Sequence, residues 1–108
     1  MTTFFVLPLL LAPAPPAAPS LSGQTPWGEL VQVGKNITIT GTTWTAAGTI
    51  KGDTVTLVWT HGERQAYGVY RVVQGGLAGH YGWCDESEIV EGDLCGEIHV
   101  EAFNITTR

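Results

Sequence analysis

Basic residues are scarce in this chain. Five lysines and arginines stand against ten aspartates and glutamates, and the formal net charge is −5. Proteins that bind nucleic acid do so largely through lysine and arginine contacts to phosphates. The charge balance therefore argues against a nucleic-acid partner.

Helical patterns are absent as well. No stretch carries alanine, leucine, glutamate and lysine at helical spacing. Threonine, aromatic residues and 14 glycines are prominent instead in a chain of 108 residues. This composition favours strands and tight turns. We predict an all-β fold, a small antiparallel meander of six or seven strands that forms a barrel or a two-layer sandwich.

Motifs for catalysis are also missing. Serine occurs only at Ser20, Ser22 and Ser87, and none of the three lies in a nucleophile elbow. The chain has no H-E-x-x-H motif, no phosphate-binding glycine loop and no paired-carboxylate motif. We therefore expect a protein that is not an enzyme and that carries no cofactor.

Only two cysteines are present, and with two histidines they form the pattern H-x3-C-x10-C-x3-H over His80, Cys84, Cys95 and His99. Residues four apart on a strand are about 13 Å apart, so the histidines and the cysteines cannot share one zinc ion. A smaller site of the two histidines with a neighbouring glutamate is geometrically feasible. We predict no metal site, and a Cys84–Cys95 disulfide if the protein is exported.

The first residues are typical of a targeting segment. Phe4 to Ala12 is an apolar run with the length of a signal-peptide core, too short to span a bilayer of about 30 Å. Ala18-Pro19-Ser20 fits a cleavage site. We therefore expect a leader over residues 1–20, a linker over 21–26 and a single β domain over 27–108, in an extracellular or periplasmic protein without a membrane span. Because no basic residue precedes the apolar run, the alternative is a proline-rich leader on a cytoplasmic or particle-associated protein.

A central hairpin is predicted around Gly75-Gly76, which separates two runs rich in valine, tyrosine and tryptophan. A two-residue turn there places Tyr70 opposite Tyr81 and Gly68 opposite Trp83. Large side chains then cover bare glycines, as expected in a stable ladder.

The two faces of the sheet follow from this register. The alternating segment from Asp53 to Thr60 pairs Trp59 with Gly68, and a Cys84–Cys95 pair on adjacent strands places His80 opposite His99. The inner face is then predicted to bury Trp59, Tyr70, Tyr81 and Trp83. The outer polar face is predicted to carry Arg71, His80, Glu97, His99 and Glu101.

Three other aromatic residues, Trp27, Trp44 and Tyr67, lie at predicted strand ends. Exposed aromatic rings on a sheet commonly stack on sugars or anchor a protein partner. We therefore predict a non-catalytic, exported binding module for a carbohydrate or a protein, with these three residues as ligand contacts. The alternative is a structural or accessory subunit that docks in a larger assembly, and a metal-dependent enzyme ranks third.

Two segments show a faint similarity to known barrels. Gly41-Thr42-Thr43-Trp44 and Leu77-Ala78-Gly79-His80-Tyr81-Gly82-Trp83 are similar to the opening strands of lipocalin-like and avidin-like barrels, where Gly-x-Trp lies on the first strand. The spacing here is Gly-x-x-Trp, and six or seven strands are fewer than those barrels need. No family is assigned on this basis, and no ligand residues are transferred.

Overall fold

The computed structural model describes residues 21–90 and 92–107, so the predicted leader over residues 1–20 lies outside the described part of the chain. The described residues form one eight-stranded antiparallel sheet in which each strand pairs with the next along the chain. The strands are β1 (Gly23–Thr25), β2 (Gly28–Val33), β3 (Asn36–Thr40), β4 (Thr45–Lys51), β5 (Thr54–His61), β6 (Arg64–Val73), β7 (Gly76–Cys84) and β8 (Ile98–Asn104), and a single 3₁₀ turn, η2 (Glu86–Glu88), follows β7. The predicted all-β meander is confirmed, with eight strands instead of six or seven.

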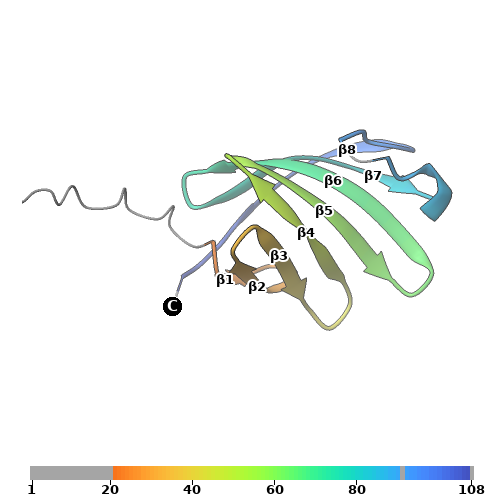
Figure 1. The fold of residues 1–108 in the computed structure, drawn as a ribbon. Coiled ribbons are helices and arrows are strands. Elements are labelled where there is room, and N and C mark those ends of the chain that lie inside the picture. The colour runs from red at the N-terminus through yellow and green to blue at the C-terminus, as the bar shows by residue number, and fades with distance from the viewer. Residues whose placement is uncertain (1–20, 91, 108) are drawn as a thin grey trace, which may run out of the picture.

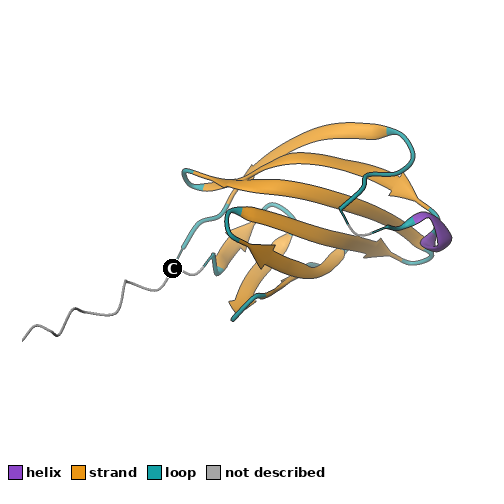
Figure 2. Cartoon of the chain, turned by 45° about the horizontal axis from the view of Figure 1, so that its top comes forward, coloured by secondary structure: helices purple, strands orange, loops and turns teal. Residues whose placement is uncertain are grey.

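The sheet curls into a half-barrel, and β1 meets the residues that follow β8 near one end (Figure 1). The backbone N–H groups of Gln24 and Thr106 each donate a hydrogen bond of 2.8 Å to the other residue's carbonyl oxygen. A Cβ atom at Gly23 would lie 2.5 Å from the Thr106 carbonyl oxygen, so glycine permits this approach. The β5–β6 hairpin lies at the opposite end of the sheet (Figure 1), as does η2, the purple turn in Figure 2. Within residues 21–90 and 92–107, no helix has the length and apolar character needed to cross a membrane.

The core lies on the concave face of the curled sheet. In β5, Val55, Leu57 and Trp59 are at most 5% exposed and alternate with half-buried residues, as the period-two pattern predicts. Strands β2, β3, β4, β6, β7 and β8 each supply one or two side chains to the core cluster. The cluster consists of Leu30, Ile37, Ile39, Ala46, Val55, Leu57, Trp59, Ala66, Tyr70, Leu77 and Phe103.

The segment 21–26, predicted as a linker, is part of this sheet. It contains β1, which pairs with β2, and the Leu21 side chain packs against the core. A strand of three residues is too short to show a periodic pattern in the sequence. The folded unit therefore includes residues before Trp27.

The central hairpin is offset from its predicted register by two residues. Tyr70 pairs with Gly79, and Tyr81 pairs with Gly68, so the predicted Tyr70–Tyr81 pair is wrong. The β5–β6 pairing is offset in the same way, because Trp59 lies opposite Ala66. An even offset keeps each side chain on its predicted face, since side chains alternate with a period of two.

The cause of this offset is the turn itself. The two turn residues are Gln74 and Gly75, and only Gly75 has a positive φ, of +81°. Gly76 is instead the first residue of β7, where a Cβ atom would clash with the Phe103 carbonyl oxygen of β8. The second glycine therefore reflects a close strand approach and not the turn.

The faces of β8 are reversed relative to the prediction. His80 pairs with Val100 instead of His99, an offset of one residue. His99 and Glu101 consequently lie on the inner face, so their placement on the outer polar face is wrong. Val100, which the predicted pairing of His80 with His99 would place on the inner face, is 79% exposed.

The cysteine pair explains this reversal. Cys84 and Cys95 form the predicted disulfide, with their Cα atoms 5.5 Å apart. However, Cys95 is not part of β8, which begins at Ile98. Gly96, which lies between Cys95 and the start of β8, has a φ of +68°. The chain is not extended from the cysteine to the strand, so the disulfide does not transmit a register to β8.

The segment that the disulfide closes returns over the outer face of β6. The Tyr67 side chain is 4% exposed there, and its hydroxyl oxygen accepts a hydrogen bond of 2.6 Å from the Gly92 backbone N–H. Tyr67 therefore anchors this loop to the sheet.

Candidate functional site: an aromatic pocket at the end of the half-barrel

A pocket of about 100 Å³ lies at the end of the sheet that carries the β5–β6 hairpin. Aromatic side chains from several strands and from the β1–β2 turn form most of its wall. The lining residues are Trp27, Trp44, Trp59, Ala66, Tyr81, Trp83 and Glu101. They include all four tryptophans of the chain. We call this site the aromatic pocket.

A small residue between two large ones creates the space. Trp59, Ala66 and Trp83 are directly opposite one another on β5, β6 and β7. Side chains in such a row are neighbours on the same face of the sheet. Because the Ala66 methyl group is short, the two indole rings have an unfilled gap between them.

Ring contacts continue from the pocket along its rim. The ring centroids of Trp44 and Trp83 are 5.3 Å apart, and those of Trp83 and Tyr81 are 5.9 Å apart. Tyr81 stacks on His99 at 5.2 Å, and Trp44 contacts His61 at 5.1 Å. These distances lie within the range of attractive aromatic pairs, so the rings support one another.

A chain of hydrogen bonds runs along the base of the pocket. The Trp59 indole N–H donates to the Tyr70 hydroxyl oxygen at 3.0 Å, and the Tyr70 hydroxyl donates to Glu101 Oε1 at 2.9 Å. Glu101 Oε2 accepts a bond of 2.8 Å from the Trp27 indole N–H. Glu101 therefore holds the partly exposed Trp27 ring in place.

Tyr70 remains a neutral donor in this chain. Its side chain is fully buried, and this burial, together with the neighbouring Glu101 carboxylate, raises the pKa of the Tyr70 hydroxyl well above its ordinary value. Gly68 makes room for the ring, since a Cβ atom at Gly68 would lie 2.5 Å from Tyr70 Cε1.

The pocket has one carboxylate and no paired cation. Glu101 is the single acidic residue in its lining. Within residues 21–90 and 92–107, the basic side chains within 4.0 Å of a carboxylate are Arg71, beside Asp53, and His99, beside Glu97, and neither contact includes Glu101. Both partners of its oxygens are neutral groups, so its negative charge is not compensated by a salt bridge.

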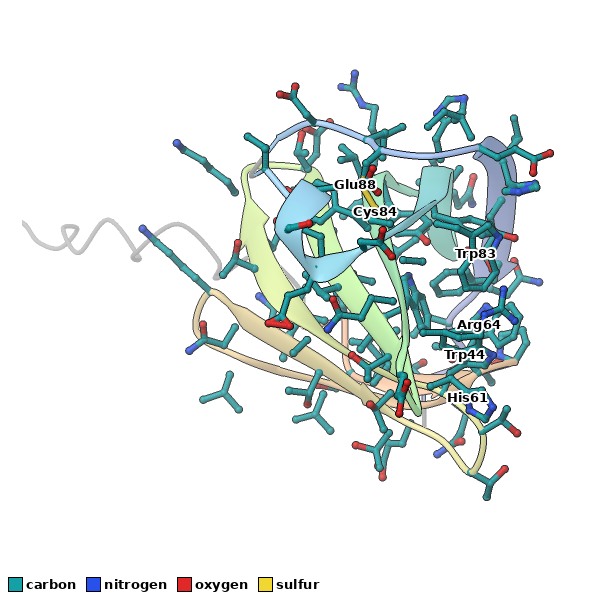
Figure 3. All side chains as sticks on the ribbon, turned by 90° about the vertical axis from the view of Figure 1, so that its right-hand side faces the viewer. Trp44, His61, Arg64, Trp83, Cys84 and Glu88 are labelled. Atoms are coloured by element: carbon teal, nitrogen blue, oxygen red, sulfur yellow. A yellow bond between two sulfur atoms is a disulfide. The ribbon has the colours of Figure 1, made fainter. Side chains whose placement is uncertain are left out.

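The cation at this end of the sheet lies on the rim. The Arg64 guanidinium carbon is 4.2 Å from the Trp83 ring centroid, a cation–π contact. Figure 3 shows Trp83, Arg64, Trp44 and His61 following one another along this side of the molecule. The Trp83 ring therefore already contacts one cation, the Arg64 side chain of the same protein.

Of the three aromatics predicted as ligand contacts, Trp27 and Trp44 line the pocket. Tyr67 does not, because it is buried on the outer face. Tyr81 and Trp83, predicted as core, are half-buried and form part of the pocket wall. The period-two pattern identified their face correctly. It carries no information on where the curled sheet forms a pocket, so it could not separate pocket residues from core residues.

Glu101 was not predictable as a pocket residue, because its face depends on the register of β8. Of the other residues of the predicted outer polar face, Arg71 and His80 do lie outside. Arg71 pairs with Asp53 at 2.8 Å and lowers the pKa of that carboxyl. The Glu97 side chain is 80% exposed, and its carboxylate is 3.9 Å from His99 Nε2.

The residues of the zinc-like pattern do not come together. The two cysteines are joined to each other, and His80 and His99 lie on opposite faces of the sheet. Among the described residues, no group of three or more histidine, cysteine, aspartate or glutamate side chains could hold a metal ion.

Comparisons with models of known families, with curated proteins and with solved structures found no match for this chain.

Proposed function

We propose that this protein is a non-catalytic binding module, and that its aromatic pocket takes a group presented by a carbohydrate or a protein partner. The observation that carries the proposal is the gathering of all four tryptophans around one pocket. Aromatic rings with accessible faces are a common means of stacking on a ligand and of anchoring a partner.

The fixed positions of the rings support a binding role. Glu101 holds the Trp27 indole, although 38% of that residue is exposed, and Tyr70 holds the Trp59 indole. A wall that is ordered before the ligand arrives lowers the entropy cost of binding.

The chemistry of the lining supports a role without catalysis. Glycoside hydrolysis, for example, requires two carboxyl groups on either side of the scissile bond. In the described part of the chain, the pocket offers Glu101 alone, and no serine, cysteine or histidine is among its lining residues.

The experiment follows the indole N–H signals of the ¹⁵N-labelled protein while carbohydrates and peptides are screened. We expect saturable shifts of these signals with a ligand, and loss of binding in Trp44→Ala. Tyr67→Phe is the matched control, because this aromatic residue lies on the outer face, and it should bind as the wild type does. Absence of any saturable shift, or binding that survives Trp44→Ala and Trp83→Ala, would contradict the proposal.

One observation favours the second candidate, a structural or accessory subunit of a larger assembly. Ile98 and Val100 of β8 are 47% and 79% exposed, and they form an apolar strip on the outer face of the last strand. Size-exclusion chromatography at several concentrations separates the two roles. Association that depends on concentration and disappears in Val100→Lys supports the assembly, and a stable monomer supports the binding module.

We also propose an extracellular or periplasmic location. The Cys84–Cys95 disulfide supports it, because disulfides persist mainly in oxidising compartments. Mass spectrometry of the protein from fractionated cells tests this: we expect an intact disulfide and a chain shortened near Ser20. Full-length protein with free thiols in the cytosol would contradict it.

A further inference from the structure

We propose that the group bound in the aromatic pocket is a methylated ammonium cation, the head group shared by choline and trimethylated lysine. This inference rests on the proposed binding function and names the chemistry that the same pocket takes. The size of the pocket, the nature of its walls and its charge all suit such a group.

The pocket is small. Its volume of about 100 Å³ is below the roughly 300 Å³ at which typical small-molecule sites begin. Such a space matches part of a ligand better than a whole sugar ring. A compact head group at the end of a longer ligand is such a part.

The walls suit a cation without N–H groups. Aromatic faces are electron-rich, and they attract a cation that lies within about 6 Å of the ring centroid. Trp44, Trp83 and Tyr81 are joined by contacts of 5.3 and 5.9 Å, and Trp27 and Trp59 meet edge-to-face at 5.8 Å on the other part of the wall. A group between them touches several rings at once, as in the aromatic cages that bind quaternary ammonium ions.

The charge of the lining has the complementary sign. Glu101 contributes a carboxylate that no lysine or arginine of the described residues neutralises, and its two bonded donors, Trp27 and Tyr70, are neutral. A bound cation would compensate this charge in a partly desolvated site, where electrostatic attraction is stronger than in water. A neutral ligand would leave it uncompensated.

Four side-chain polar atoms of the lining already have partners within the protein. Both Glu101 oxygens accept hydrogen bonds, and the indole N–H groups of Trp27 and Trp59 donate to partners inside the protein. A sugar needs new partners for its hydroxyl groups, because unpaired polar groups are costly to desolvate. A methylated ammonium group has no such requirement.

The test is a titration of the full-length protein, followed by tryptophan fluorescence and by the indole N–H signals. The ligands are tetramethylammonium, choline, trimethyl-lysine and the neutral carbon analogue of choline, in which a tert-butyl group replaces trimethylammonium. Sodium chloride keeps the ionic strength constant. We expect saturable binding of the cations, and binding of the neutral analogue weaker by at least about tenfold, the effect of losing one charge–charge interaction at a partly exposed site.

Two variants locate the charge. Glu101→Gln removes the negative charge and keeps one oxygen, which can accept from Tyr70 or from Trp27 but not from both, and it should weaken choline binding by about tenfold or more. The neutral analogue separates the two effects, because its binding should be reduced only by the loss of the Trp27 bond. Glu97→Gln removes a glutamate just before the same strand whose side chain is 80% exposed, and it should leave choline binding unchanged. If Glu101→Gln does not fold, the comparison of choline with its neutral analogue in the wild type decides alone.

The outcomes separate this inference from the proposed function. Equal binding of choline and the neutral analogue, or no saturable binding of any cation, overturns the inference. If carbohydrates or unmodified peptides still shift the indole signals in that case, the binding module stands without the cation. If no ligand shifts the indole signals, both the inference and the proposed binding function are contradicted. Binding of choline but not trimethyl-lysine, or the reverse, supports the inference and identifies the carrier.

Discussion

The Tyr70 hydroxyl donates a hydrogen bond of 2.9 Å to Glu101, although the two residues are on strands that are not neighbours in the sheet. Gly79 of β7 lies between them, opposite both, and it has no side chain to block the bond. The missing side chain at Gly79 thus leaves room for the hydrogen bond between the buried Tyr70 and the carboxylate of the aromatic pocket. The polar base of the pocket depends on this arrangement.

Tyr70→Phe should destabilise the fold and loosen the pocket. It removes the donor to Glu101 and the acceptor for the Trp59 indole N–H. Leaving buried polar groups without a partner costs about 1–3 kcal/mol each, so we expect a loss of that order in the free energy of unfolding. Chemical denaturation measures the loss, and a shift of the Trp59 indole signal reports the broken bond.

Tyr67→Phe is the control for this change. It removes the acceptor for the Gly92 N–H on the outer face, and it should cost about 0.5–1.5 kcal/mol. The pocket indole signals should stay in place. Equal shifts of the Trp59 signal in both variants would argue against the hydrogen-bond chain.

Stability should decrease in alkaline solution because of Tyr70. Burial raises the pKa of this hydroxyl in the folded state, so above a pH of about 10 the unfolded chain releases a proton that the folded protein retains. The folded state then binds more protons than the unfolded state, and the free energy of unfolding falls as pH rises. Below that pH the contribution is fully retained.

Absorbance titration of phenolate tests this expectation. Of the three tyrosines in the chain, Tyr70 should ionise only as the protein unfolds. In Tyr70→Phe, the alkaline fall in stability should be smaller than in the wild type. A Tyr70 signal that titrates normally in the folded protein would refute the claim.

The register of β8 can be tested with a pair of substitutions. Phe103 is 7% exposed and packs in the core, so Phe103→Ala should cost about 3–5 kcal/mol. Val100 is 79% exposed, so Val100→Lys should change stability by no more than about 0.5 kcal/mol. Urea denaturation of both variants gives the values. A large loss for Val100→Lys with a small one for Phe103→Ala would indicate the opposite register.

Removal of the disulfide should destabilise the protein by about 2–3 kcal/mol, the value expected for cross-linking residues 11 apart. The variant Cys84→Ser/Cys95→Ser should therefore unfold at a lower denaturant concentration. A reducing agent should lower the midpoint of the wild type and leave that of the double variant unchanged. No difference between the two proteins under oxidising conditions would show that the cross-link does not contribute.

Much of the fold could be predicted locally. The alternation in β5 and the glycines near the central turn placed Trp59, Tyr70 and Trp83 on the correct face. This assignment survived a register offset of two residues because side-chain direction repeats every two residues. The predicted faces of β8 were wrong, because an offset of one residue exchanges the two faces of a strand.

The all-β class, the disulfide and the inner position of most aromatics are properties of residue type and spacing, which act over a few neighbouring residues. The aromatic pocket does not follow from such local properties. It requires the curl of the sheet to bring Trp27 from the β1–β2 turn to Glu101 on β8, a separation of 74 residues along the chain. It also requires the β8 register, which packing of Phe103 against Tyr70 and Trp59 stabilises at ring distances of 5.9 and 6.4 Å. These contacts form only in the folded sheet, and for that reason Glu101 becomes a pocket residue only there.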